Sequence, residues 1–224
     1  MTSSTTTTTP EPQKPLRADA ERNRRRILEA AAEVFGERGL SATLDAVAEH
    51  AGVGVGTVYR RFPDKEALVD ALFEERIDEV RRIAEEAASI EDGWEALATF
   101  MERALELHCH DRALKELVFS TAHGQERVAR ARERIKPSVD RLFERARASG
   151  QLRDDVDVTD LPTLQLMVTA VMEYAHDVSP DIWRRYLTLL LDGLRARHTP
   201  LEPGPLSEDQ LDGVMARGFH MARG

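Results

Sequence analysis

The chain has 224 residues, a length that fits one or two domains with buried cores. Apolar residues make up 42% of it and charged residues 32%, which is typical of a soluble globular protein. The net charge of −9 is uneven, because residues 14–66 carry ten basic and nine acidic side chains and the remainder holds the acidic excess. No apolar run reaches the roughly 18 residues of a membrane span, and the single Cys109 excludes an internal disulfide.

The first predicted element is a disordered arm over residues 1–18, because the Ser, Thr and Pro residues there show no periodicity. From Asp19, apolar residues recur at spacings of three and four, which predicts a helix that Gly39 ends. A second helix is expected between a capping Thr43 and a helix-breaking Gly52. A short third helix follows from about residue 55 to residue 61.

The rest of the chain also has the periodicity of helices, and no strand pattern occurs in it. Asp64, Asp92 and Thr159 are placed to cap three long helices, and Pro137 falls inside another, where it should produce a kink. We therefore predict an all-α fold. The expected domains are a disordered arm (1–18), a head with a linking helix (19–80), a helical body (81–199) and a tail with a short helix (200–224).

The most informative stretch runs from Thr43 to Leu68 and reads TLDAVAEHAGVGVGTVYRRFPDKEAL. It predicts a helix, a glycine turn and a second short helix, which is the layout of a helix-turn-helix whose second helix enters the major groove of DNA. We expect the motif itself to span residues 43–62. Gly52 can adopt the positive φ of a tight turn, and Val58 can fill the core between the helices. The other residues of the motif's second helix are expected to lie on its outer face.

Residues 24–72, above all AVAEHAGVGVGTVYRRFPDKEALVDAL, resemble the tetracycline-repressor (TetR/AcrR) family of bacterial transcriptional regulators. The preceding ILEAAAEVFGERGLSATLDAVA matches that family's first helix and the entry to its second. The resemblance implies a homodimer of all-helical subunits, each with a three-helix DNA-binding head and a larger ligand-binding and dimerising body. It also implies a cytoplasmic protein that is nucleoid-associated when bound to DNA, with no cofactor, metal or membrane partner.

The function implied is that of a sequence-specific repressor that a small, mostly apolar ligand releases from its operator. A transcriptional activator, or a regulator controlled by a protein partner, is the alternative that the sequence leaves open. An enzyme is not expected, because the chain has no Gly-rich phosphate loop, metal-ligand constellation or nucleophile elbow. His108, Cys109 and His110 are adjacent on a helix and point about 100° apart, so they cannot converge on one metal ion.

The DNA surface is expected to combine hydroxyls, glycine backbone and cationic side chains. The resemblance assigns its phosphate contacts to Thr43, Thr57, Tyr59 and Lys65, and the motif adds Gly54, Val55, Gly56 and Arg60. Two positions depart from the family, which often has Ser at position 54 and Lys or Arg at position 55. The arginines between residues 22 and 26 fit two interpretations, contacts to the DNA backbone or a solvated helix face.

Two further sets of residues are predicted on the body. Apolar and polar side chains at helical spacing are expected to line a ligand pocket: Phe100, Met101, His108, Phe119, His123, Met167, Val171 and Tyr174. An apolar stripe on the last long helix is expected at the dimer interface: Trp183, Tyr186, Leu187, Leu190 and Leu194.

Overall fold

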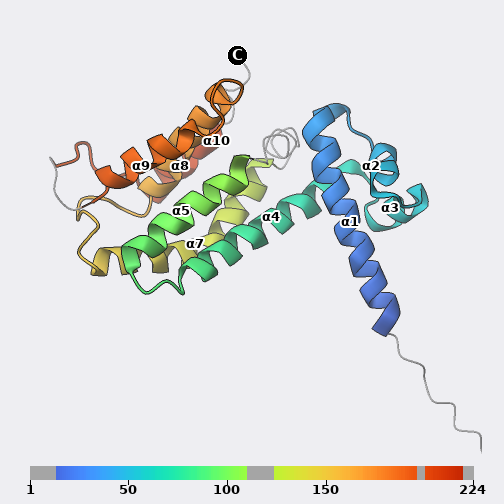
Figure 1. The fold of residues 1–224 in the computed structure, drawn as a ribbon, viewed down its shortest axis with the longest axis horizontal. Helices are drawn as coiled ribbons and strands as arrows, with labels where there is room; N and C mark the ends of the chain where they lie inside the picture. The colour runs from blue at the N-terminus through green and yellow to red at the C-terminus, as the bar shows by residue number, and fades with distance from the viewer. Residues whose placement is uncertain (1–13, 110–123, 196–199, 219–224) are drawn as a thin grey trace, which may run out of the picture. The chain divides into compact units, whose positions relative to one another are not determined.

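The computed structural model describes residues 14–109, 124–195 and 200–218. Over these ranges the chain is helical between turns, with one isolated antiparallel bridge between Leu152 and Arg195 and no β-strand (Figure 1). This confirms the all-α prediction. The chain divides into two compact units, residues 1–68 and 69–224, which we call the head and the body. The boundary lies earlier than the expected residue 80.

The head consists of α1 (Lys14–Arg38), the short 3-10 turn η1 (Gly39–Ser41), α2 (Leu44–Ala51) and α3 (Val55–Arg61), followed by the first residues of α4 (Lys65–Ala87). Helix α1 packs against α2, and α2 against α3. The predicted inner face of α1 is confirmed as buried: Ile27, Leu28, Ala31, Val34 and Phe35. However, α1 begins at Lys14, inside the arm that we expected to be disordered.

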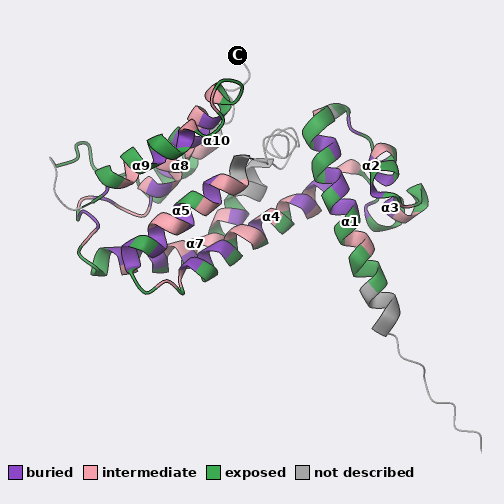
Figure 2. Cartoon of the chain, viewed as in Figure 1, coloured by how far each residue is buried: buried purple, intermediate pink, exposed green. Residues whose placement is uncertain are grey.

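The body contains the rest of α4, α5 (Gly93–Cys109), α7 (Gly124–Ala148), α8 (Asp160–Ala175), α9 (Ile182–Gly193) and α10 (Glu208–Gly218). Helix α5 is central to this unit, because α7, α8 and α9 all pack against it. The end of α4 belongs to the same core, where Ile83, Ala84 and Ala87 are buried with Leu97. Figure 2 shows these buried stripes on the inner sides of the helices.

The start of α5 approaches α7 more closely than any side chain allows. A Cβ atom at Gly93 would lie 2.4 Å from the Arg145 carbonyl oxygen, so only glycine fits there. Arg145 in turn donates from its guanidinium to the carbonyl oxygens of Ala88, Ile90 and Glu91, in the turn between α4 and α5. As predicted, Asp92 caps α5, and its Oδ1 accepts from the Glu95 backbone N–H at 2.8 Å.

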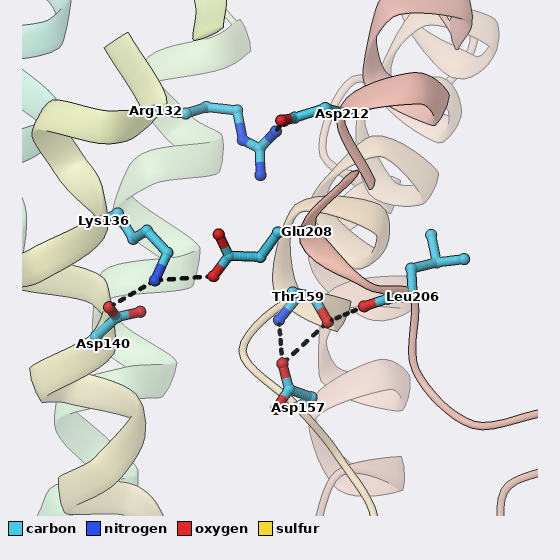
Figure 3. A network of polar contacts seen from close by, with 8 residues as sticks. All are labelled: Arg132, Lys136, Asp140, Asp157, Thr159, Leu206, Glu208 and Asp212. Atoms are coloured by element: carbon cyan, nitrogen blue, oxygen red, sulfur yellow. Dashed lines mark hydrogen bonds and ion pairs between the residues drawn. The ribbon is translucent and has the colours of Figure 1, made fainter. Parts of the chain in front are cut away.

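The described part of the tail, residues 200–218, lies against the body and contains α10 (Figure 3). Leu211 is buried, and the Lys136 ammonium on α7 pairs with Glu208 at 3.2 Å and with Asp140 at 3.1 Å. Figure 3 also shows Arg132 of α7 paired with Asp212 of α10. The Thr159 hydroxyl lies 2.8 Å from the Leu206 carbonyl oxygen and 3.0 Å from Asp157 Oδ1, and its single proton can be donated to either acceptor. Thr159 therefore holds the tail and does not cap α8 as the sequence suggested.

Candidate DNA-binding interface

The connection between α2 and α3 is a tight turn built on Gly52. Its φ of 62° and ψ of 37° lie in the left-handed region, which glycine adopts without steric cost. Two backbone bonds close the turn, from Gly52 N–H to Glu49 at 3.1 Å and from Val53 N–H to Ala48 at 3.0 Å. Thr43 caps the other end of α2, where its Oγ1 accepts from Ala46 N–H at 3.2 Å. The geometry of this turn confirms the predicted helix-turn-helix.

Arg26 on α1 fixes this turn from outside the motif. Its Nη2 donates to the Ala51 carbonyl oxygen at 2.7 Å, at the last residue of α2. The same nitrogen lies 3.3 Å from the position that a Cβ on Gly52 would take. A larger residue at 52 would therefore meet Arg26 as well as backbone strain. Sequence reasoning grouped Arg26 with the neighbouring arginines and missed this role, because the partner is 25 residues away.

Helix α3 has one buried side and one open side. Val58 is fully buried and anchors the helix in the head, as predicted. Val55 and Tyr59 are 44% and 46% exposed, and Arg60 is exposed beside them. Arg60 donates from Nη2 to the Thr57 hydroxyl at 3.2 Å, which holds both polar groups together on the surface. This side offers hydroxyl and guanidinium donors, the groups that proteins use on DNA phosphates and base edges.

The two glycines at the start of α3 leave its backbone bare. A Cβ at Gly56 would meet no atom within 4 Å, and one at Gly54 would come no closer than 3.8 Å to the Thr57 hydroxyl. Packing inside this chain therefore does not require glycine at either position. Without side chains at these positions, the helix backbone is open to the close approach that a sugar-phosphate backbone would need.

Lys65 begins α4 at the edge of this surface. Its Nζ lies 5.3 Å from the centre of the Phe35 ring, in cation–π range, and partial burial lowers its pKa from the ordinary value of 10.5. Asp64 caps the helix, with Oδ1 accepting from Ala67 N–H at 2.8 Å. All eight residues expected to contact DNA thus belong to three parts of the head: the start of α2, α3 with its approach, and the start of α4.

The described residues among those expected to line a ligand pocket lie in different surroundings on the single chain. Phe100 and Met101 are buried in the main core of the body, and Val171 packs against a second buried cluster. Met167 and Tyr174 are exposed on α8, Tyr174 at 90%, so on the single chain they lie at the surface. Phe119, His123 and the side chain of His108 lie outside the described residues.

The stripe expected at the dimer interface divides in the same way. Trp183 and Leu187 are buried within the subunit, in a cluster with α5 and α8, and Leu194 is buried in the main core. These three are core residues of the single chain, because α9 turns this side toward α5 and α8. Tyr186 is exposed and Leu190 is partly buried. The large apolar residues left open on α8, α9 and the turn between them are Met167, Tyr174, Val178, Tyr186 and Leu189.

None of the helices in the described ranges combines the length and apolarity that crossing a membrane requires. Comparison with known proteins assigns both parts of the chain. Residues 27–72 match a family model described as bacterial regulatory proteins, tetR family, and residues 92–196 match one described as the C-terminal domain of SbtR-like transcriptional regulators.

Individual proteins agree with these models. A TetR transcription regulatory protein from Mycobacterium vanbaalenii, known from its crystal structure, is 34% identical with a TM-score of 0.65, over 81% of this chain and 100% of that one. The HTH-type transcriptional regulator SrpR of Pseudomonas putida is 28% identical over 69% of this chain and 76% of its own. FadR of Bacillus subtilis, crystallised with stearoyl-CoA, is 22% identical with a TM-score of 0.61, over 75% and 97%, a likeness of fold alone.

Proposed function

The chain belongs to the TetR family of bacterial DNA-binding transcriptional regulators, and from that premise we propose that it is a homodimeric repressor released from its operator by a small, mostly apolar ligand. The observation that carries the DNA part is the open side of α3. Bare backbone at Gly54 and Gly56 adjoins the Tyr59 hydroxyl and the Arg60 guanidinium there, on a helix fixed by Val58 and the Gly52 turn.

In this proposal α3 lies in the major groove. Thr43, Thr57, Tyr59 and Lys65 contact phosphates on both sides of it. Val55, where the family often has a cation, makes only an apolar contact, of the kind that a thymine methyl group accepts.

The exposed apolar residues of α8 and α9 support the homodimer. Met167 and Tyr174 are two helical turns apart on α8, and Tyr186 and Leu189 lie on the neighbouring α9. Two helices from each subunit would form a four-helix bundle across a two-fold axis. The expected operator is then a pseudo-palindrome with half-sites roughly 34–36 Å apart, or a multiple of that distance.

The ligand is proposed to bind in the body. FadR, which shares this fold, was crystallised with stearoyl-CoA, so the architecture accommodates a long apolar chain in at least one protein. Helix α4 begins at Lys65 in the head and ends at Ala87 in the core of the body. Because one helix belongs to both units, a shift that a ligand causes in the body can be transmitted to the head through it. If the ligand weakens DNA binding, DNA must weaken ligand binding by the same factor, about 5–150-fold for a typical coupling.

One experiment tests each part in order. The purified chain selects duplexes from a random-sequence pool, and fluorescence anisotropy then measures affinity for the selected duplex. We expect a pseudo-palindromic consensus, and a weakened complex for Arg60→Ala. Compounds that raise the melting temperature of the protein are added to the complex, and release of the duplex is the expected result. Stabilising compounds that all leave affinity unchanged would refute the induction mechanism and leave DNA binding standing.

A further inference from the structure

Helix α1 is longer than the head needs. Among its described side chains, which begin at Asp19, the first buried one is Ile27, and α1 extends about 18 Å from Lys14 to Arg26. Figure 1 shows this half of α1 running past α2 and α3, and Figure 2 shows its described part as exposed or intermediate. The match to the tetR family model begins only at residue 27. Residues 14–26, which we call the α1 extension, therefore lie outside the family model, and their described side chains, from Asp19 to Arg26, lie outside the hydrophobic core.

The described side chains of the α1 extension are mostly basic. Its described part holds four arginines, Arg22, Arg24, Arg25 and Arg26, and two acids, Asp19 and Glu21, and Glu29 follows one turn after Arg25. The two acids pair with the nearest arginines, Arg22 with Asp19 and Arg24 with Glu21, and all but Arg24 among these four side chains are largely exposed. Exposed pairs of this spacing are weak and are easily exchanged for another anion.

The bond between Arg26 and Ala51 places this extension relative to α3. Because Arg26 donates to the last residue of α2, it lies beside the turn that leads directly into α3. The residues before Arg26 therefore continue α1 beyond this turn, which lies at the N-terminal end of α3. In helix-turn-helix complexes this end of the second helix enters the groove. The α1 extension is thus a basic helix at the border of the surface proposed for DNA.

We propose that the α1 extension is a second DNA contact, in which Arg22, Arg24 and Arg25 bind phosphates of the duplex beside the groove that receives α3. This inference rests on the proposed DNA binding by α3. The contact is electrostatic and independent of base sequence, because arginines on the backbone neutralise charge without reading bases. Arg26 is excluded from it, since its guanidinium is already used on Ala51.

The test is a triple variant, Arg22→Gln with Arg24→Gln and Arg25→Gln, because glutamine keeps the helix propensity of arginine and removes its charge. Affinity for the duplex that the parent chain selects is measured by anisotropy over a series of salt concentrations. We expect weaker binding and a shallower salt slope, in log affinity against log salt. The slope should fall by about 0.9 for each phosphate that the variant no longer neutralises. Circular dichroism checks that α1 remains helical.

The matched control replaces three arginines of the body by glutamine, Arg81→Gln with Arg82→Gln and Arg141→Gln, and gives the same change in net charge. It should keep the parent's salt slope. A triple variant with unchanged affinity and slope, while Arg60→Ala still weakens binding, would overturn the α1 contact and leave the function of α3 intact. The contact would also be overturned if the control lowered the slope equally, because the effect would then come from overall charge. A parent chain that selects no duplex would overturn both proposals.

Discussion

Helices α3 and α9 are each divided lengthwise into a buried side and an open side, but their open sides differ. On α3, Val58 is buried and the open side carries glycine backbone and the hydroxyl of Tyr59. On α9, Trp183 is buried and the open side carries Tyr186 and Leu189. The buried sides do the same work of anchoring a helix in its unit. In the proposed function, the open side of α3 meets a hydrated polyanion and the open side of α9 meets another apolar surface.

The buried and open sides of α9 can be compared at two residues three positions apart, Trp183 and Tyr186. Trp183→Ala removes a side chain that is only 2% exposed and should lower the free energy of unfolding by about 3–5 kcal/mol. Tyr186→Ala removes a side chain that is 44% exposed on the single chain and should cost far less. Chemical denaturation at one protein concentration measures both. Equal losses would mean that the two sides of α9 are not distinct.

A charge on the open side of α9 should break the dimer without unfolding the subunit. Leu189→Asp would bury a carboxylate between two apolar surfaces, so we expect self-association to weaken at least about a hundredfold, or roughly 2.7 kcal/mol. Sedimentation velocity measures the oligomer. Thr188→Asp, at the adjacent exposed position, is the control for added charge. A variant that remains a stable dimer would place the interface elsewhere.

On the open side of α3, the corresponding substitution should lower the affinity for DNA and leave the stability of the head unchanged. Gly56→Val finds no atom within 4 Å of its Cβ, so the head should fold normally. The same side chain would keep DNA from the backbone, and we expect at least about a tenfold loss of affinity, near 1.4 kcal/mol. Gly213→Val on α10, which also has open space, is the matched control and should bind as the parent does. A variant at 56 with full affinity would show that DNA does not approach the backbone of α3 here.

The smallest expected effect concerns Thr43, which caps the start of α2, the first helix of the motif. Thr43→Ala removes the acceptor for Ala46 N–H and should cost about 1 kcal/mol of stability. Thr43→Ser keeps the hydroxyl and should restore most of it. If Thr43 also contacts a phosphate, the alanine variant loses affinity for DNA in addition. Thermal unfolding and anisotropy of the same samples separate the two contributions.

The head could be predicted closely because its signals are local. Gly52 and Thr43 act on residues within four positions of themselves, and the spacing of the α1 core face follows from one helix alone. The caps at Asp64 and Asp92 were predictable for the same reason. Arg26 was not, since nothing in the sequence indicates that its partner is Ala51.

The body was less predictable because its assignments depend on which helices meet. The stripe of Trp183, Leu187 and Leu194 has the same pattern whether it faces a partner subunit or its own core, and only packing against α5 and α8 decides it. Thr159 lies where the sequence predicts a helix cap, but its hydroxyl bonds the Leu206 carbonyl oxygen of the tail, 47 residues away. The DNA and pocket residues remain predictions, because both concern partners outside the chain.

The attachment of α10 has a consequence for how such a chain can evolve. The helix lies beyond both regions that match family models, and two of the polar groups that hold its segment have other partners in the body. Lys136 also pairs with Asp140, and the Thr159 hydroxyl also bonds Asp157, so loss of the tail would orphan neither (Figure 3). A lineage could therefore alter or lose this helix without leaving either group unpaired, and the cost would be the apolar contact that buried Leu211 makes.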